Sequence, residues 1–158
     1  MALWQYSFLV LPEDDGSYKN FNIFEAQNDI EDLFDDERIW LKNLTKVSTF
    51  DEIGNILPKG KSWSKDIILY GHEESNRFQI YKSKNNLVEA VSFRIDFTSD
   101  YEDILRGIIE FVQMKGFIIL DEEYNKVENN AYAIKVLIEN SQRIETYKKL
   151  SKLTRKNK

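Results

Sequence analysis

The chain offers few side chains for covalent chemistry. It contains no cysteine and a single histidine, His72. Disulfides, zinc–thiolate sites and cysteine nucleophiles are therefore excluded, and so is a histidine-rich metal site. His72 lies in the polar segment Gly71–Asn76, where an imidazole exposed in a turn is a simpler interpretation than a general base lacking an orienting acid. We expect no resident metal, no cofactor and no covalent catalysis, and the sequence favours a protein that is not an enzyme.

One stretch resembles a phosphate-binding loop. Residues Gly54–Ser62 read GNILPKGKS, which places five residues between the first glycine and the Gly-Lys-Ser triplet. A P-loop has four residues there, because its successive backbone amides must wrap one phosphate. The spacing therefore predicts a surface turn, with no nucleotide bound at residues 54–62.

An acidic run is the first candidate binding site. Hard cations prefer such oxygen ligands, but the run has neither the glycine nor the terminal glutamate of an EF-hand. Two interpretations stay open: a solvated acidic face, or a docking patch whose aromatic residues act as anchors unless they belong to the core. The run comprises Asp29, Glu31, Asp32, Asp35, Asp36 and Glu37. The candidate binding residues are Phe34, Asp35, Asp36, Glu37 and Trp40.

A second candidate site combines three residues farther along the chain. Arg94 and Asp96 lie two positions apart on one expected strand face, where they form either an ion pair or a ligand site on an open sheet. Trp63 stands between two serines and is either a stacking platform or a cover for the edge of the core. These three residues are the alternative ligand site.

The net charge of −5 is unevenly distributed. Residues 148–158 carry six bases and no acid, which leaves −11 on residues 1–147, and residues 13–52 alone hold twelve acids against four bases. A net charge of −11 on residues 1–147 repels the phosphates of nucleic acids. We therefore expect a basic protein partner and no nucleic acid.

Hydrophobic periodicity predicts an α+β fold with an antiparallel meander and helices packed on one face. A first strand alternates from Trp4 to Val10, and three more strands are expected over 66–70, 77–82 and 87–97, joined by short polar turns. In the last of these, Val91, Phe93 and Ile95 point to the core, while the face with Arg94 and Asp96 is partly wet. The expected core face also includes Leu87 and Phe97, and the other face Val88, Ala90 and Ser92.

Helical signals follow and precede these strands. Ser99 and Glu102 have the spacing of a capping box before an apolar stripe over 100–115, which Gly116 ends. A short helix is expected over 50–57, a strand over 117–120 and a terminal helix capped by Asn129 or Asn130. Residues 28–47 fit a helix or a strand.

The chain as a whole, residues 1–158, is expected to form one domain with a frayed basic tail at 148–158. No apolar run approaches the roughly 20 residues that a membrane helix needs. The first residues lack the pattern of a signal peptide. We therefore expect a cytoplasmic protein that does not bind membranes.

Several patterns after residue 62 resemble those of a family of small uncharacterised bacterial α+β proteins. They are Ser62-Trp63-Ser64, the strand over residues 91–97, the capped helix, residues 117–120 and Asn140-Ser141. Some proteins of this kind resemble immunity partners of bacterial toxins. The resemblance covers about residues 62–145 and implies no catalytic residue.

The sequence is compatible with three functions. The first is an acidic binding protein, in particular an immunity-type inhibitor of a basic protein. The second is an enzyme or small-ligand-binding protein that uses Arg94, Asp96 and Trp63. The third is a structural or oligomeric accessory subunit that assembles through sheet edges.

Overall fold

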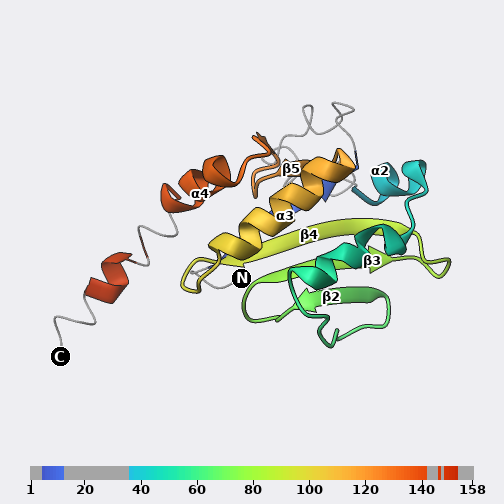
Figure 1. The fold of residues 1–158 in the computed structure, drawn as a ribbon, viewed down its shortest axis with the longest axis horizontal. Helices are drawn as coiled ribbons and strands as arrows, with labels where there is room; N and C mark the ends of the chain where they lie inside the picture. Colours follow the sequence, from blue (N-terminus) through green and yellow to red (C-terminus); the bar gives the residue numbers. More distant parts are fainter. Residues whose placement is uncertain (1–4, 13–35, 142–145, 147, 153–158) are drawn as a thin grey trace, which may run out of the picture.

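An antiparallel sheet with helices packed on one face forms the molecule, as predicted (Figure 1). The computed structural model describes residues 5–12, 36–141, 146 and 148–152. Within them the strand order is β2-β3-β4-β1-β5-β6. The strands are β1 (Gln5–Leu11), β2 (Ile67–Gly71), β3 (Arg77–Lys82), β4 (Val88–Asp96), β5 (Ile118–Leu120) and β6 (Lys126–Val127). The main helices are α2 (Asp36–Asn43), the 3₁₀ helix η3 (Val47–Asn55), α3 (Glu102–Lys115) and α4 (Ala131–Glu139).

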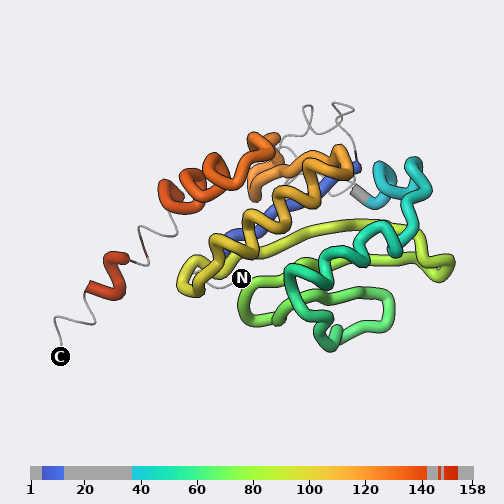
Figure 2. Tube along the Cα trace, in the orientation of Figure 1, coloured from blue at the N-terminus to red at the C-terminus, as the bar shows by residue number. Residues whose placement is uncertain are grey.

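The predicted meander β2-β3-β4 is confirmed, and β1 extends it. Residues 5–10 of β1 pair with residues 91–96 of β4, and residues 9–11 pair with β5. The tube of β1, in blue in Figure 2, therefore runs between two strands that come much later in the chain. The first strand of the sequence thus occupies the interior of the sheet.

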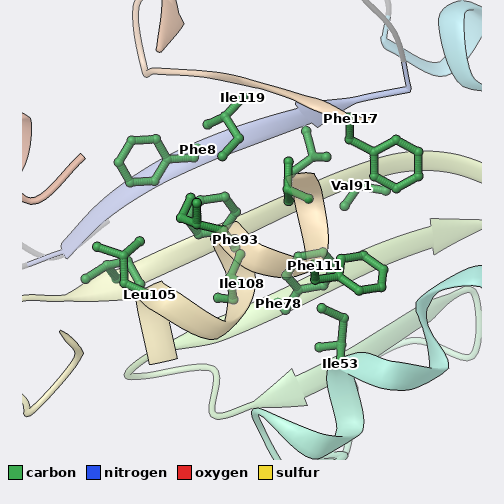
Figure 3. Close-up of a cluster of buried hydrophobic side chains, with 14 of the residues drawn as sticks. Phe8, Ile53, Phe78, Val91, Phe93, Leu105, Ile108, Phe111, Phe117 and Ile119 are labelled. Atoms are coloured by element: carbon green, nitrogen blue, oxygen red, sulfur yellow. The ribbon is translucent and has the colours of Figure 1, made fainter. Parts of the chain in front are cut away.

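The core lies between the sheet and the helices α3 and η3 (Figure 3). Phe8, Phe93 and Phe78 are register partners on three adjacent strands, with ring centroids 4.9 Å and 6.3 Å apart. The apolar stripe of α3 packs over this row of rings, because its 3.6-residue period places the bulky side chains on one face. Its buried residues are Leu105, Ile108, Ile109, Phe111 and Val112.

The expected faces of β4 hold for most of the strand and change at its start. Val91, Phe93 and Ile95 are buried beneath α3, as predicted. Lys82 pairs with Val88 while Tyr81 pairs with Ala90, so one extra residue of β4 sits between these pairs. This bulge turns the side chain of Val88 into the core, which corrects its assignment to the opposite face.

Two helical details differ from the prediction. Ser99 does not cap α3, because its hydroxyl donates to the carbonyl of Asp96, and Glu102 instead pairs with Lys135 at 2.8 Å. Gly116 does end α3 in the left-handed conformation, with φ of 73°. The helix expected over 50–57 is the 3₁₀ helix η3, which starts at Val47 and ends at Asn55.

The C-terminal helix begins where predicted. The Asn130 side chain accepts the Ala133 N–H at 3.1 Å, and α4 runs from there to Glu139. In the basic tail, residues 148–152 are helical and Leu150 is half exposed, while residues 153–158 lie outside the described residues. None of the described helices is long and apolar enough to cross a bilayer.

Candidate functional site

The predicted anchor Trp40 is wrong, because its side chain belongs to the core. Residues 36–43 form α2, which resolves the ambiguity of this segment in favour of helix. The indole of Trp40 is 0% exposed, packs edge-on against Phe50 and Phe117, and donates from Nε1 to the carbonyl of Val10 at 3.0 Å. A partner cannot reach it without unfolding the domain's core.

The structure describes only some of the remaining residues of the predicted acidic site. Phe34 and Asp35 lie outside the described residues, as do Asp29, Glu31 and Asp32, and Asp36 is the first residue of α2. Glu37 is exposed on the first turn of this helix. Glu37 is thus the residue of this run whose side-chain environment the structure describes.

Glu37 is part of an acidic cluster that the fold assembles from three distant segments. Its other members are Asp66, just before β2, and Glu89, the extra residue in the bulge of β4. The pKa of the Glu89 carboxyl is raised, first by its partial burial and then by the negative charges of Glu37 and Asp66. We call Glu37, Asp66 and Glu89 the acidic cluster.

No base neutralises this cluster within the part of the chain that the structure describes. No lysine or arginine there forms a salt bridge with any of its three carboxylates. Glu102 shows the contrast, because its salt bridge with Lys135 lowers the pKa of the Glu102 carboxyl. The acidic cluster therefore presents like charges that repel one another.

An exposed aromatic residue, Tyr81, pairs through its backbone with residues adjacent in sequence to two members of the acidic cluster. Tyr81 pairs across the sheet with Ile67, the residue after Asp66, and with Ala90, the residue after Glu89. Its side chain is 38% exposed. Tyrosine is enriched among residues that dominate the affinity of interfaces.

Arg94 and Asp96 are buried rather than partly wet, because the β2–β3 turn folds over them. Each is 7% exposed. The Arg94 guanidinium donates to the carbonyls of Glu73 and Ser75, and the Asp96 carboxylate accepts from Ser75 Oγ at 3.1 Å. We call this arrangement, with Asn76, the hairpin clamp.

Asn76 completes the hairpin clamp. Its Oδ1 accepts the backbone N–H of Asp96 at 2.7 Å, and its Nδ2 donates to Ser99 Oγ at 2.7 Å. The pKa of the Arg94 guanidinium is lowered to about 10, first by burial and then by Arg77, its cross-strand neighbour, against the opposing effect of Asp96. These polar groups are engaged with one another and with the backbone, so the clamp connects the turn to the sheet.

Trp63 does not share a site with Arg94 and Asp96. It is 71% exposed in the loop before β2, above a hollow of about 420 Å³ that Lys82 also lines. Arg94 pairs with Arg77 at the start of β3, whereas Lys82 is the last residue of that strand. The alternative ligand site is therefore divided between the two ends of β3, and that composite site is wrong.

The two motifs set aside from the sequence both lie in turns. His72 is exposed, and its Nδ1 accepts the backbone N–H of Glu74 at 3.1 Å. Residues 54–62 span the end of η3 and an extended segment in which Lys59 pairs with Tyr70. This is not the strand–loop–helix arrangement of a P-loop. Within the described residues, no three His, Asp or Glu side chains are grouped to hold a metal ion.

Sequence reasoning missed Asp66, Glu89 and Tyr81. A signal for Glu89 was present: by period two it falls on the same face as Leu87 and Val91, where a charged residue does not belong. A glutamate in core register indicates a bulge, and the bulge is what brings it to the acidic cluster. Asp66 and Tyr81 carried no comparable signal, because their proximity depends on strand pairing.

Comparison of the chain with known protein families, with curated proteins and with solved structures gave no match.

Proposed function

We propose that the protein is a non-enzymatic binding protein that captures a basic protein through the acidic cluster, in the manner of an immunity-type inhibitor. The observation that carries this proposal is the convergence of Glu37, Asp66 and Glu89 without a neutralising base among the described residues. Like charges held together this way destabilise the free protein slightly, and a cationic partner relieves the repulsion on binding.

The carboxylates and Tyr81 contribute to different steps of binding. Exposed carboxylates speed the encounter with a basic partner, and salt screens them over about 10 Å. Tyr81 supplies a rigid ring with a polar tip, the kind of group that slows dissociation once it is covered. The net charge of −5 extends the attraction beyond the cluster itself.

The sheet edges give less support to the accessory-subunit alternative. The outer edge of β2 is partly covered by residues 58–60, where Gly71 N–H donates to the carbonyl of Pro58 at 2.7 Å. At the other end of the sheet, β6 spans only Lys126–Val127. Short or covered edges discourage strand addition between copies.

The test is retrieval of a partner by the native chain, followed by kinetics with that partner. A variant with Glu37→Gln, Asp66→Asn and Glu89→Gln is compared with a control of equal charge, Glu110→Gln, Glu123→Gln and Glu128→Gln, whose residues are also exposed. We expect the cluster variant to associate about tenfold more slowly at low salt, and the control far less. Tyr81→Ala should mainly speed dissociation. An association rate that both triple variants lower equally would contradict the role of the cluster.

A further inference from the structure

The loop before β2 forms an arch over the edge of the sheet. Gly60 N–H donates to the carbonyl of Leu69 at 2.8 Å, after which the chain leaves the strand. It re-enters the sheet at Ile67, the first residue of β2, whose N–H donates to the carbonyl of Ser64 within the loop at 3.3 Å. Residues 61–66 thus span the strand edge, and a hollow of about 420 Å³ opens between arch and strand.

Serine hydrogen bonds hold the arch in shape. Ser62 Oγ donates to Ser64 O at 2.7 Å and accepts Ser64 N–H at 3.0 Å, while Asp66 N–H donates to Ser64 Oγ at 3.2 Å. At its base, a Cβ on Gly60 would lie 2.6 Å from the carbonyl oxygen of Gly71, so only glycine fits. A loop fixed before its ligand arrives loses little entropy on binding.

Three lysine residues and no acidic residue line the hollow. They are Lys59, Lys65 and Lys82, and none forms a salt bridge within the described residues. Lys82 Nζ donates to Asn86 Oδ1 at 3.1 Å, a neutral acceptor. Three lysines without salt bridges around one hollow, in a chain of net charge −5, favour an anion as its ligand.

Trp63 adds a ring face to this basic hollow. The indole is 71% exposed although it belongs to a loop fixed by hydrogen bonds, so its face is open to stacking. Tryptophan stacks on planar rings of any substitution and also carries one N–H donor. The walls beneath it, Ile67 and Leu69, are apolar.

We infer that this hollow, the Trp63 hollow, binds a small phosphorylated molecule that carries a planar ring. The lysines take the phosphate and the indole stacks on the ring. The volume falls within the range of small-ligand sites. A longer nucleic acid strand is disfavoured, because Asp66 lies between the lining residues Lys65 and Ile67 and repels further phosphates.

A phosphorylated ligand here departs from the expectation of no nucleotide at residues 54–62, which is based on the spacing of a P-loop, a motif that wraps phosphate in backbone amides. Here the charge comes from lysine side chains of three separate segments, and Lys61, the lysine of the Gly-Lys-Ser triplet, does not line the hollow. The inference is also independent of the acidic cluster, since different residues carry it.

Calorimetric titration with four compounds tests the inference. Adenosine 5′-monophosphate and phenyl phosphate carry ring and phosphate, adenosine carries the ring alone, and inorganic phosphate carries the charge alone. We expect the first two to bind with Kd near or below about 1 mM and at least about tenfold more tightly than either single-feature compound. No binding by the first two, or equal binding of inorganic phosphate, would overturn the inference.

Substitutions test whether these compounds bind in the Trp63 hollow. Trp63→Ala should weaken it about tenfold, the loss of one stacked ring, whereas Trp63→Phe should retain most of it. Lys65→Gln with Lys82→Gln should weaken it and flatten its salt dependence. Lys84→Gln, an exposed lysine outside the hollow, is the matched control and should change nothing. Since Trp63 is exposed, its variants should melt like the native protein. Binding that survives both Trp63→Ala and the lysine pair would place the ligand elsewhere and overturn the assignment.

Discussion

The two ends of β4 carry charged residues in opposite circumstances. Near its start, Glu89 is partly exposed beside two other carboxylates, and no base neutralises it among the described residues. At its end, Arg94 and Asp96 are buried and bonded to the β2–β3 turn. One strand thus holds both the acidic cluster and the hairpin clamp.

The difference separates charge used for structure from charge available for binding. Buried charges are tolerated only when hydrogen bonds replace water, and the clamp supplies these from the backbone of one turn. Exposed carboxylates need no such partners, and their repulsion is weakened by solvent. Substitution should therefore damage the fold at one end of β4 and alter only electrostatics at the other.

The largest expected effect is at Asp96. Replacing Asp96 by Ala removes the acceptor of Ser75 and Thr98 and leaves Arg94 buried with less compensation. We expect the free energy of unfolding to fall by about 3 kcal/mol. Urea denaturation measures this, with the exposed Asp66→Ala as the control that should lose almost nothing. A loss below about 1 kcal/mol would mean that the clamp contributes little to stability.

A smaller effect is expected at Asn76. Changing Asn76 to Ala leaves the Asp96 N–H and Ser99 Oγ without this partner, so the free energy of unfolding should fall by about 1–3 kcal/mol. Hydrogen exchange at the Asp96 amide should speed up at the same time. Unchanged protection of that amide would show that another acceptor replaces the side chain.

The smallest effect is expected at Glu89, with the opposite sign. Its pKa is raised in the folded protein, so ionisation of Glu89 destabilises the fold, and that loss develops as pH rises from the unfolded pKa through the folded pKa. Glu89→Gln should therefore stabilise at pH 7 by no more than about 0.5 kcal/mol and make no difference below about pH 4. Urea unfolding at both pH values measures it. A stabilisation that persists at low pH would have a cause other than charge.

The sequence predicted the fold correctly where the fold depends on local hydrophobic periodicity. Phe93 and Ile95 alternate with polar residues and lie in the core, and Gly116 ends α3 as its left-handed conformation requires. The failures occurred where a long-range contact overrides a local signal. Ser99 has the spacing of a cap, but the carbonyl of Asp96 and the side chain of Asn76 occupy its hydroxyl.

The candidate site was less accessible to sequence reasoning. Charge counting found Glu37 but not its neighbours, since Asp66 and Glu89 approach it only once the sheet has formed. Trp40 shows the converse error, because aromatic residues among acids resemble interface anchors and core residues equally. Burial distinguishes the two, and burial is a property of the fold.

The position of β1 inside the sheet has a consequence for synthesis on the ribosome. Residues 5–10 leave the exit tunnel long before their partners at residues 91–96 and 118–120. Until then β1 is an apolar segment with two unpaired edges exposed to solvent, where it is prone to aggregation. Closing such long loops is also slow. Folding of this chain should therefore finish only after β5 has been translated, with the nascent β1 as the segment that a chaperone must protect.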